Sequence, residues 1–134
     1  MPCAYSYWYG ILEAASDFGD GISVTSHLPF GAEYDSVLEW FIKSGARTSQ
    51  EVTKDSTNWG NFWNSQNSPE GIVETGLCNK WSTMKICDFA GNVAEWTQER
   101  NGFTHHVIRG GNYGLFGTHY PAANRDYDRR PCAP

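Results

Sequence analysis

Two stretches of the chain carry apolar side chains at helical spacing, one over residues 7–18 and one over residues 32–44. In both, apolar residues recur three or four positions apart, which places them along one face of a helix. Glycine follows each stretch, at Gly19 and Gly45, and favours termination there. The stripe residues are Trp8, Ile11, Leu12, Ala15 and Phe18, then Tyr34, Val37, Leu38, Trp40, Phe41 and Ile42. The pattern predicts two amphipathic helices.

Alternation of apolar and polar residues indicates strands elsewhere. Residues 22–25 alternate weakly, which predicts a short strand. Residues 85–97 and 107–113 read as two further extended segments, and the polar stretch between them, residues 98–106, is typical of a hairpin.

Residues 46–74 show neither period and are rich in Asn, Ser, Thr and Gly. Trp59, Phe62 and Trp63 interrupt this polar stretch, so we expect a long ordered loop held in place by aromatic rings. A loop of this length in a compact domain is either functional or stabilised by something specific, such as an ion.

Composition narrows the possibilities further. A chain of 134 residues, 40% hydrophobic and with a net charge of −5, predicts one globular domain. It has no apolar run of the ~18 residues that a membrane span needs, and its acidic excess is unlike that of a basic nucleic-acid binder. The spacing of Cys3, Cys78, Cys87 and Cys132 matches no common zinc pattern, which leaves free thiols or a Cys78–Cys87 disulfide open.

Three sequence blocks then follow one another in a fixed order. They are Ser26 to Trp40, Asp88 to Trp96 (Asp-Phe-Ala-Gly-Asn-Val-Ala-Glu-Trp), and Arg109-Gly110-Gly111 with Ala122 to Arg125. They resemble motifs of the formylglycine-generating-enzyme/sulfatase-modifying superfamily. The resemblance implies an α+β, C-type-lectin-like fold, with two helices on a small twisted antiparallel sheet and much irregular loop.

The two ends of the chain depart from the family pattern. Relatives usually begin with strands before the first helix and finish in a strand that reads Gly-Phe-Arg. In this chain the first predicted helix starts at residue 7, almost at the beginning, and the sequence ends in Pro-Cys-Ala-Pro. We therefore expect a single domain over residues 1–134 that lacks its first and last strands. Either the sequence is a fragment, or those strands have been replaced.

Some members of this family are metal-dependent oxidases. Formylglycine-generating relatives bind copper through a Cys pair downstream of the Arg-Gly-Gly block, where this chain has only Cys132. Sulfoxide-synthase relatives bind iron through a His cluster. Here His105 and His106 are adjacent and would point to opposite faces of a strand, while His27 and His119 are distant in sequence. We predict no catalytic residue and keep the oxidase as an alternative.

The C-terminal segment, residues 109–134, has an unusual composition. It contains no Lys, Glu, Gln, Met or Trp, whereas the preceding 108 residues contain 23 residues of these five types. Codons that end in a pyrimidine cannot encode these five. The resemblance extends to the variable proteins of diversity-generating retroelements, which carry this fold. In these proteins, adenines of such codons are randomised in a C-terminal segment. The resemblance therefore implies that residues 109–134 are a variable segment.

Within this segment the resemblance separates framework from exposed positions. Aromatic and short polar side chains give a large, adaptable contact area. The segment carries a charge of +2 against −7 for the rest of the chain, which favours anionic or polar partners mildly. We expect Tyr113 to pack on the sheet and His119, Tyr120 and residues 126–128 to be exposed. The predicted ligand-binding residues are Tyr113, Leu115, Phe116, His119, Tyr120, Asp126, Tyr127 and Asp128.

The predicted framework residues are Trp40, Asp88, Trp96, Arg109, Gly110, Gly111 and Arg125. We expect both tryptophans in the core, and Arg109 either bonded to Asp88 or Glu95 or exposed. Its two following glycines permit positive φ or close backbone approach. At Asn92 and Glu95 we expect a structural network without metal. A Ca²⁺ site formed by these two residues with backbone carbonyls is the alternative, which the resemblance implies because relatives bind calcium near this block.

Together these features predict a non-catalytic, receptor-recognition module with a diversified C-terminal surface. By family analogy it belongs to a phage tail or a bacterial cell surface, and its partner is a protein or glycan on a cell surface. No nucleic acid, membrane insertion or required cofactor is expected, and calcium and oligomerisation are left open. A structural virion domain is the remaining alternative.

Overall fold

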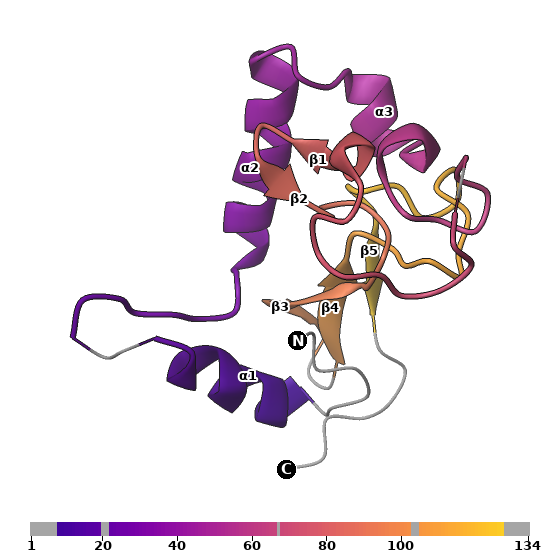
Figure 1. Ribbon diagram of the computed structural model, residues 1–134. Helices are drawn as coiled ribbons and strands as arrows, with labels where there is room; N and C mark the ends of the chain where they lie inside the picture. Colours follow the sequence, from indigo (N-terminus) through magenta and orange to yellow (C-terminus); the bar gives the residue numbers. More distant parts are fainter. Residues whose placement is uncertain (1–7, 20–21, 67, 103–104, 128–134) are drawn as a thin grey trace.

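The computed structural model describes residues 8–19, 22–66, 68–102 and 105–127 (Figure 1). The helices are α1 (Trp8–Asp17), α2 (Gly31–Lys43) and α3 (Ser49–Thr53), with 3-10 turns η1 (Thr57–Trp59) and η2 (Asn79–Trp81). The strands are β1 (Ser82–Thr83), β2 (Ile86–Cys87), β3 (Glu95–Asn101), β4 (His105–Arg109) and β5 (Arg125–Tyr127). β1 and β2 form one antiparallel pair, and β3, β4 and β5 form an antiparallel sheet in that order. The expected α+β class is confirmed.

The hydrophobic core lies between α2 and the chain that follows α3. Phe41 of α2, Trp59 and Phe62 have no solvent exposure, and the Phe41 and Trp59 rings meet edge to face with centroids 6.1 Å apart. Such aromatic pairs contribute stability beyond the area that they bury. The core therefore joins the second predicted helix to the polar stretch that the sequence marked as a ring-held loop.

The helical stripe of α2 is confirmed in part. Tyr34, Leu38 and Phe41 are buried, as the spacing of three and four residues predicts. Trp40 is 44% exposed, so its predicted core position is wrong. The reason is geometric, because a residue two positions after Leu38 lies about 200° around the helix, on the opposite face.

The polar stretch over residues 46–74 contains more regular structure than expected. Thr48 and Glu51 cap α3 reciprocally: the Thr48 hydroxyl accepts from the Glu51 amide at 3.2 Å, and the Glu51 carboxylate accepts from the Thr48 amide at 2.7 Å. This Thr-x-x-Glu pattern is a recognised helix-start signal, but one turn of helix is too short to show a period. Trp63 is 50% exposed and does not hold the loop as predicted.

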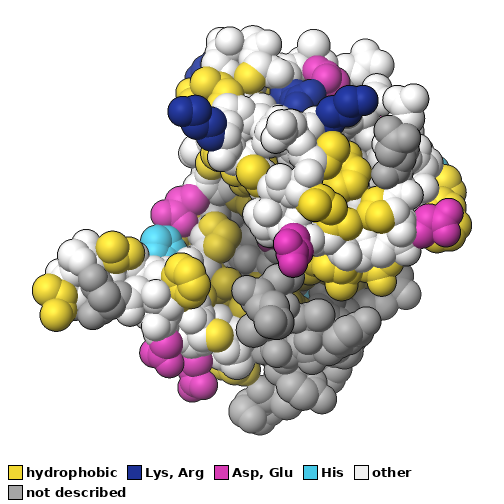
Figure 2. Space-filling model, in the orientation of Figure 1, with side chains coloured by type: hydrophobic (Ala, Val, Ile, Leu, Met, Phe, Trp, Pro, Cys, Tyr) yellow, Lys and Arg dark blue, Asp and Glu magenta, His cyan; other side chains and the backbone are white. Residues whose placement is uncertain are grey.

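α1 is attached to the sheet through its first residue. The Trp8 ring stacks on His106 of β4 with centroids 3.5 Å apart, and its Nε1 donates to the Thr97 carbonyl of β3 at 3.0 Å. Phe18, at the other end of the predicted stripe, is 88% exposed. Figure 2 shows apolar side chains at this tip, where the chain turns between α1 and α2.

The strand predicted over residues 22–25 is not formed. Ile22 is 96% exposed and Val24 is 56% exposed. Four weakly alternating residues bury too little apolar surface to specify a strand. In contrast, the hairpin predicted around residues 98–106 is present as β3 and β4. None of the helices described is both long and apolar enough to cross a membrane.

The chain after β4 packs closely on η1, and Gly117 lies at the contact. The Gly117 carbonyl accepts from the Ser56 amide at 3.1 Å, and a Cβ at this glycine would lie 2.6 Å from the Thr57 amide nitrogen.

We expect Gly117→Ala to lower the free energy of unfolding by about 2 kcal/mol, because the backbone must move to make room for the methyl group. Urea denaturation measures this change. Gly114→Ala, whose Cβ would meet only the Asn112 side chain at 3.4 Å, is the control. Equal stability of the two variants would contradict the prediction.

Candidate functional site

Arg109 is the buried charge at the base of the C-terminal segment. Its side chain has no solvent exposure; Nη2 lies 2.5 Å from Asp35 of α2, and Nη1 lies 3.3 Å from Glu99 of β3. The guanidinium carbon lies 4.6 Å from the Tyr34 ring centroid, in cation–π geometry. The predicted partners, Asp88 and Glu95, are wrong, and so is the alternative of an exposed Arg109. Its actual partners lie on elements that sequence spacing does not place beside β4.

Arg125 of β5 completes this charge network. It stands opposite Arg109 in the sheet, and like charges at such positions repel. Asp35 and Glu99 each bridge the two arginines: Arg125 lies 2.9 Å from Glu99 and also pairs with Asp35. The four side chains therefore tie α2, β3, β4 and β5 together at the place where the C-terminal segment begins and returns.

The two glycines after Arg109 set the path of the segment. Gly110 and Gly111 have φ of +84° and +69°, the positive values that the sequence allowed for. A Cβ on Gly111 would lie 2.7 Å from the Tyr120 carbonyl oxygen. Because only glycine permits this approach, the loop between Gly111 and Tyr120 can fold back onto the framework.

The backbone of the segment is held by hydrogen bonds to distant framework residues. The Tyr113 amide donates to the Asn92 carbonyl at 3.1 Å, and the Leu115 carbonyl accepts from the Trp63 amide at 2.9 Å. Farther along, the Ala122 amide donates to the Ser56 hydroxyl, which is fully buried, at 2.9 Å. Over residues 109–127 the segment is thus largely irregular but anchored at several points.

The side chains of the predicted ligand-binding residues divide between surface and framework. We call Leu115, Phe116, His119, Tyr120, Asp126 and Tyr127 the tail surface. Phe116 and Tyr127 are 45% and 41% exposed, and His119 is also exposed, with its ring 5.8 Å from that of Phe116. The expected exposure is therefore found at His119 and Tyr127.

Tyr120 and Asp126 were also expected to be exposed, and this expectation is wrong because both are half-buried. Leu115, Tyr120 and Asp126 line a small hollow of about 40 Å³ beside Ile108. Tyr113 is also half-buried, as expected for packing on the framework. Asp128 lies outside the described residues. Trp63 is exposed, and its amide donates to the Leu115 carbonyl, so it borders the tail surface.

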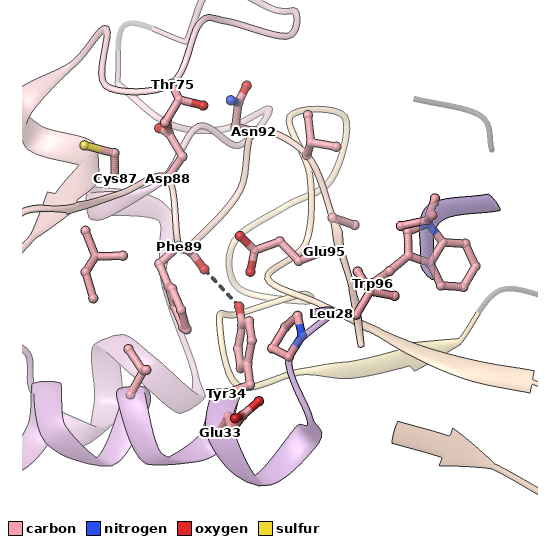
Figure 3. Close-up of a pocket in the computed structure, with 16 residues that line it drawn as sticks. Leu28, Glu33, Tyr34, Thr75, Cys87, Asp88, Phe89, Asn92, Glu95 and Trp96 are labelled. Carbon is pink, nitrogen blue, oxygen red and sulfur yellow. Dashed lines mark hydrogen bonds between the residues drawn. The ribbon is translucent and has the colours of Figure 1, made fainter. Parts of the chain in front are cut away.

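A larger cavity, of about 580 Å³, opens between α1, α2 and the chain from β2 to β3 (Figure 3). Most of its wall is apolar, from Leu28, Val37, Ile86, Phe89 and Trp96 among others. The charged lining residues are Glu33, Asp88 and Glu95. We call this feature the acidic cavity. The sequence did not predict it, and Trp96, expected in the core, is a half-buried part of its wall.

Burial perturbs the ionisable groups of the acidic cavity. It raises the pKa of Glu95 to about 7; the Asp88 carboxylate raises it too, and the Tyr34 hydroxyl opposes the shift. The pKa of Tyr34 is also raised, chiefly by burial. Its hydroxyl donates to the Phe89 carbonyl at 3.0 Å (Figure 3). Glu95 therefore changes charge near neutral pH.

Asp88 is satisfied on one side only. Its Oδ2 accepts from the Gly76 amide at 3.0 Å, whereas Oδ1 is buried without a hydrogen-bond partner among the described residues. The whole side chain is 91% shielded, since its exposure is 9%. An unpaired buried carboxylate oxygen is unfavourable, so this atom marks the cavity wall as a place where a donor is missing.

Asn92, one of the two candidate calcium residues, takes part in a hydrogen-bond network. The Asn92 amide oxygen already accepts from the Asn61 side chain at 3.2 Å and from the Val73 amide at 3.0 Å, and its nitrogen donates to the Val73 carbonyl. As arranged, this amide does not fit a cation, so calcium at Asn92 and Glu95 stays a prediction that these bonds disfavour. Over the described ranges, no three His, Cys, Asp or Glu side chains gather as a metal site.

The histidines and cysteines are placed as follows. His27 contacts Glu33 at 3.1 Å. His106 is buried under Trp8, and the ring of His105 lies 5.6 Å from that of Tyr127. Cys78 and Cys87 are half-buried free thiols, while Cys3 and Cys132 lie outside the described residues.

Comparison with known proteins gives two findings. The model of a family described as "Sulfatase-modifying factor enzyme 1-like domain" matches residues 4–134. Among solved structures, the chain is similar to Treponema denticola variable protein 1, with 21% sequence identity, a TM-score of 0.49, and coverage of 80% of this chain and 43% of that one. The chain thus spans less than half of that protein's length. A search of curated proteins finds no match.

Proposed function

The chain belongs to the sulfatase-modifying factor enzyme 1-like family, and we propose that it acts there as a non-catalytic ligand-binding module. In this proposal residues 109–134 are a variable segment and the tail surface recognises the partner. The partner is a protein or glycan on a cell surface, and the module is displayed on a phage tail or a bacterial surface.

One observation carries the proposal: the C-terminal segment combines an anchored backbone with projecting side chains. Gly111, Gly117 and Ala122 are fixed against framework atoms, while Phe116 and His119 between them reach solvent. The side chains of such a segment can vary without a change in the path of its backbone. Rigid display of aromatic rings also lowers the entropy lost on binding.

The chemistry of the tail surface suits recognition of varied partners. Phe116, Tyr127 and the neighbouring Trp63 offer large apolar faces, and His119 and Asp126 add polar groups beside them. Aromatic residues of this type carry much of the binding energy in known interfaces. No reactive or catalytic group is required for such a surface to act.

The described histidines also support binding over oxidase chemistry. His27 pairs with Glu33, His106 stacks on Trp8, and His119 lies beside Phe116, so each occupies a different part of the fold. An iron-binding cluster requires them to converge. This separation favours the non-catalytic branch of the proposal.

A display library tests the proposed function. Phe116, His119 and Tyr127 are randomised in one library, and three exposed α2 positions, Ser36, Glu39 and Lys43, are randomised in a matched control library. Both are selected against the same panel of purified proteins and glycans. We expect specific binders only from the tail library, since its positions reach solvent from the anchored C-terminal segment.

Two results would count against the proposal. If neither library yields binders, or if the α2 library yields as many as the tail library, the tail surface has no special capacity for recognition.

Whether residues 109–134 are diversified by a retroelement is tested separately, in the neighbouring DNA. A near-identical repeat that differs only at adenines, beside a reverse transcriptase gene, is expected if the segment is diversified.

A further inference from the structure

We propose that the acidic cavity binds a small organic amine, with the ammonium group beside Asp88 and Glu95 and the apolar body against the rest of the wall. This site is separate from the tail surface and does not depend on the proposed function. The cavity volume of about 580 Å³ lies within the usual range for small-molecule sites, roughly 300–1,000 Å³.

The charge of the wall selects the sign of the ligand. The lining includes three carboxylates, from Glu33, Asp88 and Glu95, and no Lys, Arg or His is among its described residues. Glu33 is engaged at the rim, where it accepts from the Phe30 amide at 2.8 Å and contacts His27. The two inner carboxylates therefore have no basic side chain beside them in the lining.

The unpaired oxygen of Asp88 is the second, independent indication. Asp88 is 9% exposed and lines the cavity, yet its Oδ1 has no hydrogen-bond partner in the described part of the chain. An ammonium group carries three donors and a positive charge, so it can serve both Glu95 and this wall. A neutral alcohol offers one donor and no charge.

The apolar part of the wall determines the rest of the ligand. Val37 of α2, Ile86 of β2 and Trp96 of β3 line the cavity. Phe89, from the chain between β2 and β3, lines it as well (Figure 3). An alkyl or aryl chain on the amine would fill this region, and a bare inorganic cation would leave it empty.

Titration of the full chain with three probes of one length tests the inference: hexylamine, hexanol and hexanoate, followed by NMR or calorimetry at pH 8. We expect hexylamine to bind at least about tenfold more tightly than hexanol, the gain of a charge-assisted hydrogen bond, and hexanoate not to bind. Glu95→Gln and Asp88→Asn should each weaken hexylamine binding by about tenfold.

Matched variants separate the site from general effects. Glu39→Gln removes an equal charge from the exposed side of α2 and should change binding less than twofold. His119→Ala, on the tail surface, should leave it unchanged, so failure of the proposed function does not touch this test. Val37→Trp fills the cavity and should abolish binding, provided the thermal transition shows a folded variant.

Three outcomes would overturn the inference. Equal binding of hexylamine and hexanol would remove the role of the carboxylates. Absence of binding by all three probes would remove the site. Calcium chloride could instead raise the unfolding temperature of the wild type but not of Glu95→Gln, while hexylamine has no effect on either. That result would assign the carboxylates to a metal ion.

Discussion

Replacing Arg109 by methionine is expected to lower the free energy of unfolding by about 3–5 kcal/mol. The guanidinium is fully buried, pairs with Asp35 and Glu99, and lies over the Tyr34 ring. The substitution removes two charge-assisted hydrogen bonds and the cation–π contact, and leaves Arg125 as the one partner of both carboxylates among the described residues. The midpoint of urea unfolding at pH 7 measures the loss.

Two comparisons decide whether the network is the cause. Arg125→Met removes the half-exposed arginine of the same network and should lower stability by about 1 kcal/mol or less. Combining Arg109→Met with Glu99→Gln should recover part of the loss, since one carboxylate then balances the one remaining arginine, Arg125. Equal losses for the two arginine variants would contradict the account.

Raising the pH from 4.5 to 7 is expected to destabilise the wild type through Glu95 by about 3 kcal/mol. The folded pKa of Glu95 is raised from its ordinary value of 4.5 to about 7. Between these values the unfolded chain has released the proton while the folded chain retains it. Stability therefore falls across this window and levels off above it. Unfolding measured from pH 4 to 8 tests the slope.

Glu95→Gln keeps the shape of the side chain and removes the titration. We expect this variant to lose the extra pH slope and to be more stable than the wild type at pH 8, whereas Glu39→Gln, on the exposed side of α2, keeps the slope. If the free energy of unfolding changed equally with pH in the wild type and in Glu95→Gln, the raised pKa of Glu95 would be refuted. Calcium, if it bound here, would remove the fall in the wild type by favouring the charged form.

Local sequence signals predicted the parts of the fold that depend on local structure. The spacing of Tyr34, Leu38 and Phe41 indicated the buried face of α2, and the hairpin formed where two extended segments flank a polar stretch. Hydrophobicity alone predicts a core position for Trp40, but its angle around the helix places it on the solvent side. The sequence does not predict β5, because a strand of three residues is too short to show an alternation of apolar and polar side chains.

The site was harder to predict because it depends on contacts between distant segments. Sequence similarity pointed to the Arg-Gly-Gly turn and the C-terminal segment, and exposure of His119 and Tyr127 agrees with it. Asp35, however, lies 74 residues from Arg109, so no spacing rule joins them. The acidic cavity likewise forms only when α1, α2 and β3 meet, which no motif records.

Saturation substitution of residues 109–127, sorted by resistance to proteolysis, tests the central claim most directly. The account predicts that Phe116, His119 and Tyr127 accept most side chains within about 0.5 kcal/mol, since they project into solvent. Gly111 and Ala122, which touch framework atoms, should accept almost none. Equal intolerance at the projecting and the anchored positions would mean that the tail rings hold the fold together and are not displayed for recognition.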